Sequence, residues 1–194
     1  MWGPETSDAD SAFVRKAARH FGKAYLYHNL AESCFTRVLT VDGVPAGIFC
    51  VSKVGSHGRK PFYDFMSAVN LVPLLCLKKF RAYVSGWKRY FHFCTVQENN
   101  LPNKFDAEVK LLFARDDFRG MGLGSKMLDE INKLLSEKGL SSFFLHTDTE
   151  CDYTFYDKVG LTMLDKLSFP IPSDKGYTMY LYGTRSLKAS SPTA

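Results

Sequence analysis

The chain has 194 residues, of which 45% are hydrophobic and 14% aromatic, and it carries a formal net charge of +5. This length and apolar content predict one folded domain with a substantial core and exclude a disordered chain. The charge is mild and the Lys and Arg residues are dispersed, so the composition does not favour nucleic-acid binding.

The N-terminal part is predicted to be helical and then to form a β-hairpin. Residues 1–13 contain acidic side chains and no apolar core, so we expect no signal peptide. Residues 8–34 place apolar side chains at helical spacing, which predicts one or two helices. Two β-rich runs then flank Asp42-Gly43, a dipeptide typical of a two-residue hairpin turn.

Residues 62–94 are rich in Phe, Tyr and Leu and carry interspersed basic residues. We expect two helices here, divided or kinked near Pro73 and Gly86. The helices either pack on the sheet as an amphipathic pair with basic side chains outward, or form a lid over a substrate cleft or a surface for a membrane or partner. The basic residues are Lys78, Lys79, Arg81, Lys88 and Arg89.

From residue 107 onward the pattern becomes regular. The run 107–114 is a nearly continuous apolar strand, which indicates that both of its faces are covered. The helix that follows places Leu123, Met127 and Ile131 on one face and stops at Gly139. Further along we expect strands at 141–148, 161–169 and 177–183 and a short helix at 151–160.

This order, βαβαββ behind a hairpin, predicts an α+β fold in which helices flank a mixed central β-sheet. Residues 62–94 would be a helical insertion between the hairpin and the strand at 107–114. We expect residues 1–186 to form a single domain and the small, polar residues 187–194 to form a flexible tail. The longest uncharged run, 65–77, is too short to span a bilayer.

The cysteines and histidines show no disulfide or metal-binding pattern. The five cysteines are odd in number, widely spaced and never in a CxxC pair, which is typical of reduced thiols in a cytoplasm. The five histidines form no HExxH or HxxxH pair, so the sequence predicts no metal site. The cysteines are Cys34, Cys50, Cys76, Cys94 and Cys151.

The stretch FARDDFRGMGLGSKMLDEI, residues 113–131, carries the strongest functional signal. It places Gly120, Gly122 and Gly124 where an extended run changes into a helix, although glycine is unfavourable inside helices. The spacing fits neither the P-loop pattern GxxxxGK[ST] nor the dinucleotide pattern GxGxxG. Bare N–H groups at the helix start, the positive end of its dipole and the cation of Arg119 would together bind an anion.

This segment resembles the acetyl-CoA-binding signature of the GNAT acetyltransferase superfamily, [Q/R]-x-x-G-x-[G/A], which it matches at Arg119, Gly122 and Gly124. The resemblance extends over about residues 36–183, and FYDKVGL (155–161) stands where that family has FYEKLGF. It implies a bacterial-type single-domain member with the GNAT fold, whose loop holds the pyrophosphate of coenzyme A through backbone N–H groups. A glycine-rich turn without a ligand is the alternative.

The resemblance also assigns residues to the cofactor. Backbone amides at Leu112–Ala114 would meet pantetheine and the reacting oxyanion, because in that family this strand splays from the next. Thr149 stands where the family often has a cofactor-contacting asparagine, for which a hydroxyl could substitute. The assigned residues are Leu112, Phe113, Ala114, Arg119, Gly120, Met121, Gly122, Leu123, Gly124, Ser125 and Thr149.

Acetyl transfer to an amine needs an acid for the departing thiolate and a base for the ammonium group. Tyr156 matches the family's general-acid tyrosine; the alternative is a packing role, with Tyr153 as the reserve acid. Glu108 lies eleven residues before Arg119, the offset of the catalytic glutamate in histone-type members; the alternative is an ion pair with a lysine. His146 is expected to be a hydrogen-bonded strand residue.

The resemblance therefore predicts a cytoplasmic, acetyl-CoA-dependent N-acetyltransferase that acetylates a primary amine by direct attack in a ternary complex. A small-molecule amine is favoured over a protein amine. The alternatives are a non-catalytic acyl-CoA-binding module and a membrane- or partner-binding protein that uses residues 62–94. We expect no nucleic-acid partner and no membrane association, and a homodimer stays open because aromatic surface could form its interface.

Overall fold

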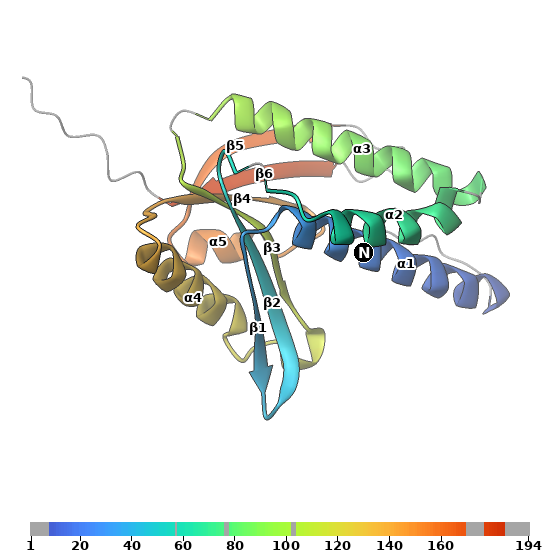
Figure 1. Cartoon of the computed structure of the whole chain (residues 1–194), viewed down its shortest axis with the longest axis horizontal. Helices are drawn as coiled ribbons and strands as arrows, with labels where there is room; N and C mark the ends of the chain where they lie inside the picture. Colours follow the sequence, from blue (N-terminus) through green and yellow to red (C-terminus); the bar gives the residue numbers. More distant parts are fainter. Residues whose placement is uncertain (1–7, 57, 76–77, 102–103, 170–176, 185–194) are drawn as a thin grey trace, which may run out of the picture. The chain divides into compact units, whose positions relative to one another are not determined.

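The computed structural model describes five stretches of the chain, which Figure 1 draws as ribbons. They are residues 8–56, 58–75, 78–101, 104–169 and 177–184. The predicted tail lies outside these residues. The chain forms two compact units: a helical unit of Met1–Ser33 and His57–Cys94, and a sheet unit of Cys34–Ser56 and Thr95–Ala194.

The helical unit is built on two helices that lie side by side. The first helix, α1, is a single helix over Asp8–Glu32, and α2 spans Pro61–Leu75. The Ser67 hydroxyl of α2 donates a buried 2.9 Å hydrogen bond to the Ala24 carbonyl of α1. A buried hydrogen bond of this kind helps to fix α2 against α1.

The third helix, α3 (Lys78–Asn99), extends further than the sequence indicated. Gly86 lies inside α3, and Pro73 lies in the last turn of α2, two residues before that helix ends. A proline near the end of a helix removes one hydrogen bond without ending the helix. The two predicted helices and the division near Pro73 are confirmed, because α2 ends at Leu75 and α3 begins at Lys78; the division near Gly86 is wrong, because Gly86 lies inside α3.

The outward face of α2 is apolar rather than basic. Phe62 and Phe65 are 66% and 64% exposed, and further exposed apolar residues follow them at helical spacing. On α3, by contrast, Lys88 and Arg89 are exposed, as the amphipathic interpretation expects. No helix in the described part of the chain is long and apolar enough to cross a bilayer. The exposed apolar residues of α2 are Phe62, Phe65, Val69, Val72 and Leu75.

In the part of the chain that the structure describes, the sheet unit contains six strands in the order β1-β2-β3-β4-β6-β5. Every neighbouring pair is antiparallel except β3 and β4, which are parallel, so the predicted mixed sheet and α+β class are confirmed. Asp42 and Gly43 form the predicted hairpin turn, both with positive φ. The strands are β1 (Phe35–Val41), β2 (Val44–Lys53), β3 (Ala107–Ala114), β4 (Phe143–Asp148), β5 (Thr162–Phe169) and β6 (Tyr177–Gly183).

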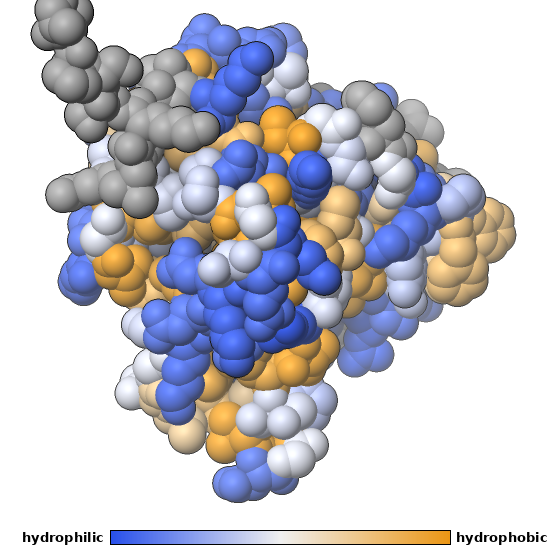
Figure 2. All heavy atoms as spheres, turned by 60° about the vertical axis from the view of Figure 1, so that its left-hand side comes forward, coloured by the Kyte–Doolittle hydropathy of each residue, from blue (hydrophilic) through white to orange (hydrophobic). Residues whose placement is uncertain are grey.

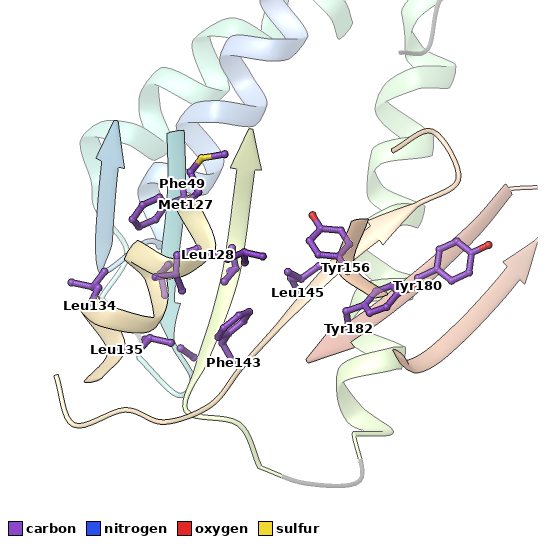
Figure 3. Close-up of a cluster of buried hydrophobic side chains, with 14 residues drawn as sticks. Phe49, Met127, Leu128, Leu134, Leu135, Phe143, Leu145, Tyr156, Tyr180 and Tyr182 are labelled. Atoms are coloured by element: carbon purple, nitrogen blue, oxygen red, sulfur yellow. The ribbon is translucent and has the colours of Figure 1, made fainter. Parts of the chain in front are cut away.

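Two helices, α4 (Leu123–Glu137) and α5 (Thr154–Lys158), cover one face of this sheet. The apolar stripe of α4 packs on the strands, and its centre, Met127 and Ile131, is at most 1% exposed. Figure 3 shows this core, in which α4 meets Phe49 of β2 and Phe143 of β4. The outward side of α4 is polar, and hydrophilic side chains gather in the centre of the face seen in Figure 2.

Candidate active site

The strands β3 and β4 part in the middle of the sheet. Only three residue pairs join them, the last of which is Val109–Leu145. Both strands continue beyond that pair, β3 to Ala114 and β4 to Asp148, and Figure 3 shows them diverging. The two strands therefore leave an opening toward their carboxyl ends, as the implied splay requires.

Backbone groups of β3 face this opening. The Arg115 N–H donates a 2.9 Å hydrogen bond to the Ala46 carbonyl on the β2 side, and successive strand residues present their backbone groups to alternating sides. Leu112 and Ala114 therefore direct their N–H groups away from β2, toward the opening. Phe113 is 52% exposed, so this strand is not covered on both faces as its composition indicated.

Asp106 joins β3 and β4 at their amino-terminal ends, where the two strands are still paired. Its carboxylate accepts hydrogen bonds from the N–H groups of Ser141 and Ser142 at 2.8 and 3.1 Å, and from both of their hydroxyls at 3.0 Å. These donors, the Ser141 N–H first among them, lower the pKa of Asp106. Four donors on one carboxylate fix the start of β3 against the start of β4, where the pairing of the two strands begins.

The three glycines of the turn after β3 are required for two different structural reasons. Gly120 and Gly122 have φ of +79° and +69°, a backbone conformation that residues other than glycine rarely adopt. A Cβ on either glycine would meet no described atom within 4 Å. A Cβ on Gly124 would instead lie 2.8 Å from the ring of Phe155. The first two glycines therefore border open space, whereas the third is required by packing within the chain.

The helix α4 begins directly after this turn with unused N–H groups. Its first hydrogen bond runs from the Lys126 N–H to the Gly122 carbonyl, and no side chain caps Gly122. Among the residues that the structure describes, nothing accepts a hydrogen bond from the N–H groups of Leu123, Gly124 or Ser125. These groups carry the positive end of the helix dipole and would bind an anion.

Arg119 adds an exposed cation to the turn. Its side chain is 80% exposed, and its Nη2 lies 2.8 Å from Asp116 Oδ1. An exposed ion pair of this kind contributes little energy, so the guanidinium can turn toward a stronger anion. Open space at two glycines, unused N–H groups and a cation together fit a diphosphate.

Tyr156 lies on α5 at the edge of the apolar core. Its side chain is 9% exposed and packs on Phe155 and Tyr182, with ring centroids 5.2 and 5.4 Å apart. Figure 3 shows the ring beside Leu145, the last residue of β4 that pairs with β3. The phenol is therefore held where the opening begins.

The neighbouring tyrosines have other contacts. The ring of Tyr153, the reserve candidate for the acid, stacks on Tyr180 with centroids 4.3 Å apart. The Tyr182 hydroxyl donates to Asp157 Oδ2 at 3.2 Å, and burial, reinforced by this bond, raises the pKa of Tyr182 to about 12. Tyr156 stays the candidate acid because of its match to the family's tyrosine in FYDKVGL.

Glu108 lies on the opposite face of the sheet from Tyr156. Its neighbours Ala107 and Val109 belong to the core beneath α4, so the alternation of the strand turns Glu108 to the other face. Its Oε2 lies 2.6 Å from the Nζ of Lys110. The alternative foreseen for this residue, an ion pair with a lysine, is therefore present in the structure.

His146 and Glu98 complete the group around Glu108. His146 Nδ1 lies 3.9 Å from Glu108 Oε1, and the candidate ligand atoms of Glu98, Glu108 and His146 all lie within 4.8 Å of one another. The side chains of Glu108 and His146 are only 13% and 6% exposed. Two carboxylates, an ammonium group and an imidazole thus gather beside the opening.

The sequence profile of the acetyltransferase (GNAT) family matches residues 8–160. The chain belongs to this family. The family transfers acetyl groups and uses acetyl-CoA as the donor, so the predicted cofactor is confirmed at the level of the family. Among curated proteins, none matches the sequence significantly.

Several solved structures share the GNAT fold at low sequence identity. The ribosomal-protein-S18-alanine N-acetyltransferase from Escherichia coli is similar at 12% identity, with a TM-score of 0.50, over 93% of this chain and 90% of that one. A GNAT family acetyltransferase from Elizabethkingia anophelis with acetyl-CoA bound has 10% identity and a TM-score of 0.47, over 82% and 80%. Ard1 from Thermoplasma volcanium has 19% identity and a TM-score of 0.43; the match covers 75% of this chain and 66% of that chain.

In this GNAT protein, most of the residues implied to bind the cofactor lie together. Residues 119–125 form the turn and the start of α4, and residues 112–114 lead into that turn. Thr149 has a different position: its hydroxyl accepts from the Thr178 N–H at 3.4 Å, and its N–H donates to the Thr178 carbonyl at 3.1 Å. Thr149 continues the ladder between β4 and β6, so its contact with the cofactor stays a prediction.

Sequence reasoning missed Glu98 and Lys110 as neighbours of Glu108. Lys110 had a signal, because residues i and i+2 of a strand share a face. Glu98 had none, since it lies on α3 in a segment without any pattern that points to the sheet. The sequence could therefore have predicted Lys110 as a neighbour of Glu108, but not Glu98.

Proposed function

We propose that this chain is an acetyl-CoA-dependent N-acetyltransferase that acetylates a primary amine by direct attack in a ternary complex. One observation carries the proposal: the opening between β3 and β4 leads directly into a turn with two open glycine positions and an uncapped helix start. A diphosphate on that turn would direct an attached thioester toward the parted strands. Bound there, acetyl-CoA would supply an acetyl group activated as a thioester.

The chain's own residues would then take three roles. The unused N–H groups of Leu123, Gly124 and Ser125 hold the diphosphate, and those of Leu112 and Ala114 bind the carbonyl oxygen and the pantetheine amides. The Tyr156 hydroxyl donates a proton to the departing sulfur, because a phenol is protonated at neutral pH. Glu108, from the opposite face, accepts the proton of the attacking ammonium group.

We infer that the acceptor is a small-molecule primary amine, in keeping with two carboxylates near the opening. Glu98 and Glu108 would attract a compact ammonium group. A protein N-terminus is the competing acceptor, and the same screen tests it. We further propose a cytoplasmic location, from the cysteine pattern, and a homodimer contact through the exposed apolar residues of α2.

The decisive experiment combines binding and turnover. Acetyl-CoA at 100 times its dissociation constant should stabilise the protein by about 2.7 kcal/mol in a thermal-shift assay. A library of small amines and peptide N-termini, screened by release of the coenzyme A thiol, then identifies the acceptor. Stabilisation without turnover on any amine would support the alternative, a non-catalytic acyl-CoA-binding module. Without any stabilisation, the proposed function is wrong.

A matched pair of variants tests the turn itself. Gly122 and Gly139 lie just before and just after α4, and both have positive φ and open space where a Cβ would stand. Gly122→Ala and Gly139→Ala should therefore lose similar stability, roughly 1–2 kcal/mol. Only Gly122→Ala should lose the stabilisation by acetyl-CoA. If both variants keep it, the turn is not the binding site.

A further inference from the structure

Three apolar side chains form an exposed row across β1, β2 and β3, which Figure 3 shows side by side. Val38 of β1 and Phe113 of β3 are 54% and 52% exposed, and Ile48 of β2 is partly buried. In the strand registers, Val38 stands opposite Ile48, and Ile48 stands opposite Phe113. These three residues are called the apolar row below. Because neighbouring strands lie about 4.8 Å apart, the row extends over about 10 Å.

The apolar row lies on the face of the sheet that α4 does not cover. Each of its residues is flanked along its strand by residues that pack in or against the core beneath α4. Successive residues of a strand point to opposite faces, so the row itself points away from that core. The flanking core residues are Leu39 on β1, Phe49 on β2, and Leu112 and Ala114 on β3.

A β-bulge places Phe113 on the same face as Glu108. Before the bulge, Val109 belongs to the core beneath α4, so Glu108 points away from it. In the register with β2, the pairing then passes from Val109 directly to Leu111, which makes Lys110 an extra residue of β3. An extra residue reverses the alternation of the strand beyond it. Without the bulge, Phe113 would point into the core as Val109 does.

Apolar side chains are unexpected at these positions. A sheet with one solvated face normally alternates apolar residues inward with polar residues outward. Two residues before and after Val38, β1 follows this rule with the exposed Thr36 and Thr40. Phe113 lies on the third of six strands, in the interior of the sheet, and yet is half exposed. Contiguous apolar side chains on a surface of this kind favour a binding site.

The apolar row begins at the opening between β3 and β4. Phe113 stands between Leu112 and Ala114, whose N–H groups bind the reacting carbonyl oxygen in the proposed function. The turn that would hold the diphosphate leads into α4, which covers the opposite face of the sheet. The cofactor therefore enters from the side of α4, and the side of the apolar row is left for the acceptor.

We propose that the apolar row binds the apolar part of the acceptor, whose amino group reaches the opening beside Phe113. The acceptor is then a primary amine that carries an aryl group or an alkyl chain of about 10 Å, the length of the row. Such a molecule matches this face at both ends, since carboxylates lie beside the opening and apolar side chains lead away from it. This inference rests on the proposed function and names its class of acceptor.

A second copy of the chain would be the competing occupant of the row. Three partly exposed side chains offer roughly 200–300 Å² of apolar surface. A stable protein interface buries about 800 Å² on each partner. The row alone is therefore too small for a dimer contact, whereas its size suits a small molecule.

The first test is a series of unbranched alkylamines from propylamine to octylamine, followed by release of the coenzyme A thiol. The specificity constant kcat/KM should rise roughly two- to fourfold with each added methylene, because each one leaves water as it covers the row. An amine of the same length as octylamine with ether oxygens in its chain should react no better than propylamine. Equal kcat/KM for all amines of the series would overturn the proposal.

A matched pair of valine variants locates the effect. Val38→Thr keeps the shape of the side chain at the far end of the row but replaces a methyl group by a hydroxyl. It should lower kcat/KM for octylamine roughly two- to fivefold and leave that for propylamine unchanged. Val54 is 49% exposed just beyond the end of β2, and Val54→Thr should leave the whole series unchanged. The same result for both variants would contradict the proposal.

Phe113→Ala should have the larger effect, because Phe113 lies nearest to the opening. We expect kcat/KM for octylamine to fall roughly 10- to 100-fold and most of the dependence on chain length to disappear. A raised KM for acetyl-CoA with an unchanged amine series would instead assign the ring to the cofactor. A changed oligomeric state of Val38→Thr in sedimentation, again with an unchanged series, would assign the row to a contact between copies. Either result would overturn the proposal.

NMR of the methyl groups gives a readout that needs no turnover. With coenzyme A present, octylamine should shift the methyl signals of Val38 and Ile48, but not those of Val54, and propylamine should shift none of them. The signals are identified by their loss in Val38→Thr, Ile48→Leu and Val54→Thr. Absence of these shifts would overturn the proposal whether or not the protein turns over. Shifts without thiol release from any amine would contradict the proposed function and leave the apolar row as an amine-binding site.

Discussion

The two faces of the central sheet differ in what they bury. The face beneath α4 and α5 is an apolar core, in which Ile131 and Tyr182 are fully buried. The other face buries a small apolar cluster and, beside it, the charges of Glu108, Lys110 and His146. The first face can hold the protein together, whereas the second retains charged groups that add little to stability.

This difference predicts that substitutions on the two faces have separable effects. Apolar truncations beneath α4 should lower the free energy of unfolding, and charge substitutions on the other face should lower turnover. Tyr156 is the informative exception, because it packs in the core and is also the proposed acid. The opening between β3 and β4 is the place where groups from both faces, Tyr156 and Glu108, could reach the same substrate.

Tyr156→Phe should give the largest effect. Loss of the phenolic proton should lower kcat by roughly 10²- to 10⁴-fold, the usual contribution of general acid catalysis. KM for acetyl-CoA should stay the same, because the turn is untouched. The free energy of unfolding should change by no more than about 1.5 kcal/mol, since only a hydroxyl is removed.

Steady-state kinetics and urea denaturation of the same preparations check this prediction. Tyr153→Phe is the matched control, because Tyr153 stacks on Tyr180 and keeps its ring in that variant. A normal kcat in Tyr156→Phe would assign the acid to another group. An equal loss of kcat in both variants would point to the aromatic cluster as a whole rather than to one proton.

The sequence predicted those parts of the molecule that local patterns encode. The hairpin at Asp42-Gly43, the apolar stripe of α4 and the strand at 107–114 all follow from periodicity and turn chemistry, and the structure confirms them. The glycine motif predicted an open, uncapped helix start, which is also present. These features depend on residues that are neighbours in the chain.

The remainder depended on contacts between distant residues. Gly124 resembled a ligand-binding glycine, yet Phe155, which packs against it, lies 31 residues later in the sequence. Gly86 seemed to divide a helix that continues through it, because tertiary packing outweighs the local propensity of one glycine. Glu98 lies within 4.8 Å of ligand atoms of Glu108 and His146, although it is ten residues from Glu108 and 48 from His146 in the sequence.

The second prediction tests the apolar face. Ile131→Ala removes a fully buried side chain from the centre of α4 and should lower the free energy of unfolding by about 2–5 kcal/mol. In the fraction that remains folded, kcat should be nearly normal, because Ile131 has no role in the proposed reaction. Urea denaturation gives the first quantity, and activity per folded molecule gives the second. A large loss of kcat in fully folded protein would contradict the separation of the two faces.

The third prediction concerns the closed end of the opening. Asp106→Asn weakens four hydrogen bonds that join the starts of β3 and β4, and it should lower stability by about 1–3 kcal/mol at neutral pH. Because the folded pKa of Asp106 is lowered, its contribution is complete above the ordinary value of 3.8 and disappears as the pH falls through the folded pKa. Denaturation curves at neutral and acidic pH should therefore converge for wild type and variant. A difference that persists in acid would mean that the variant acts through strain.

The smallest effect is expected where charges are exposed. Arg37 of β1 and Glu130 of α4 are 2.7 Å apart but 41% and 42% exposed, so a double-mutant cycle with Arg37→Gln and Glu130→Gln should give a coupling below about 1 kcal/mol. That coupling should vanish near 1 M salt, where screening acts over roughly 3 Å. The same cycle with Glu108→Gln and Lys110→Met should give a larger coupling that survives salt, because water reaches this pair much less. If the exposed pair couples as strongly as the buried pair, burial does not strengthen the interaction between Glu108 and Lys110. The proposed difference between the two faces of the sheet would then be wrong for their charges.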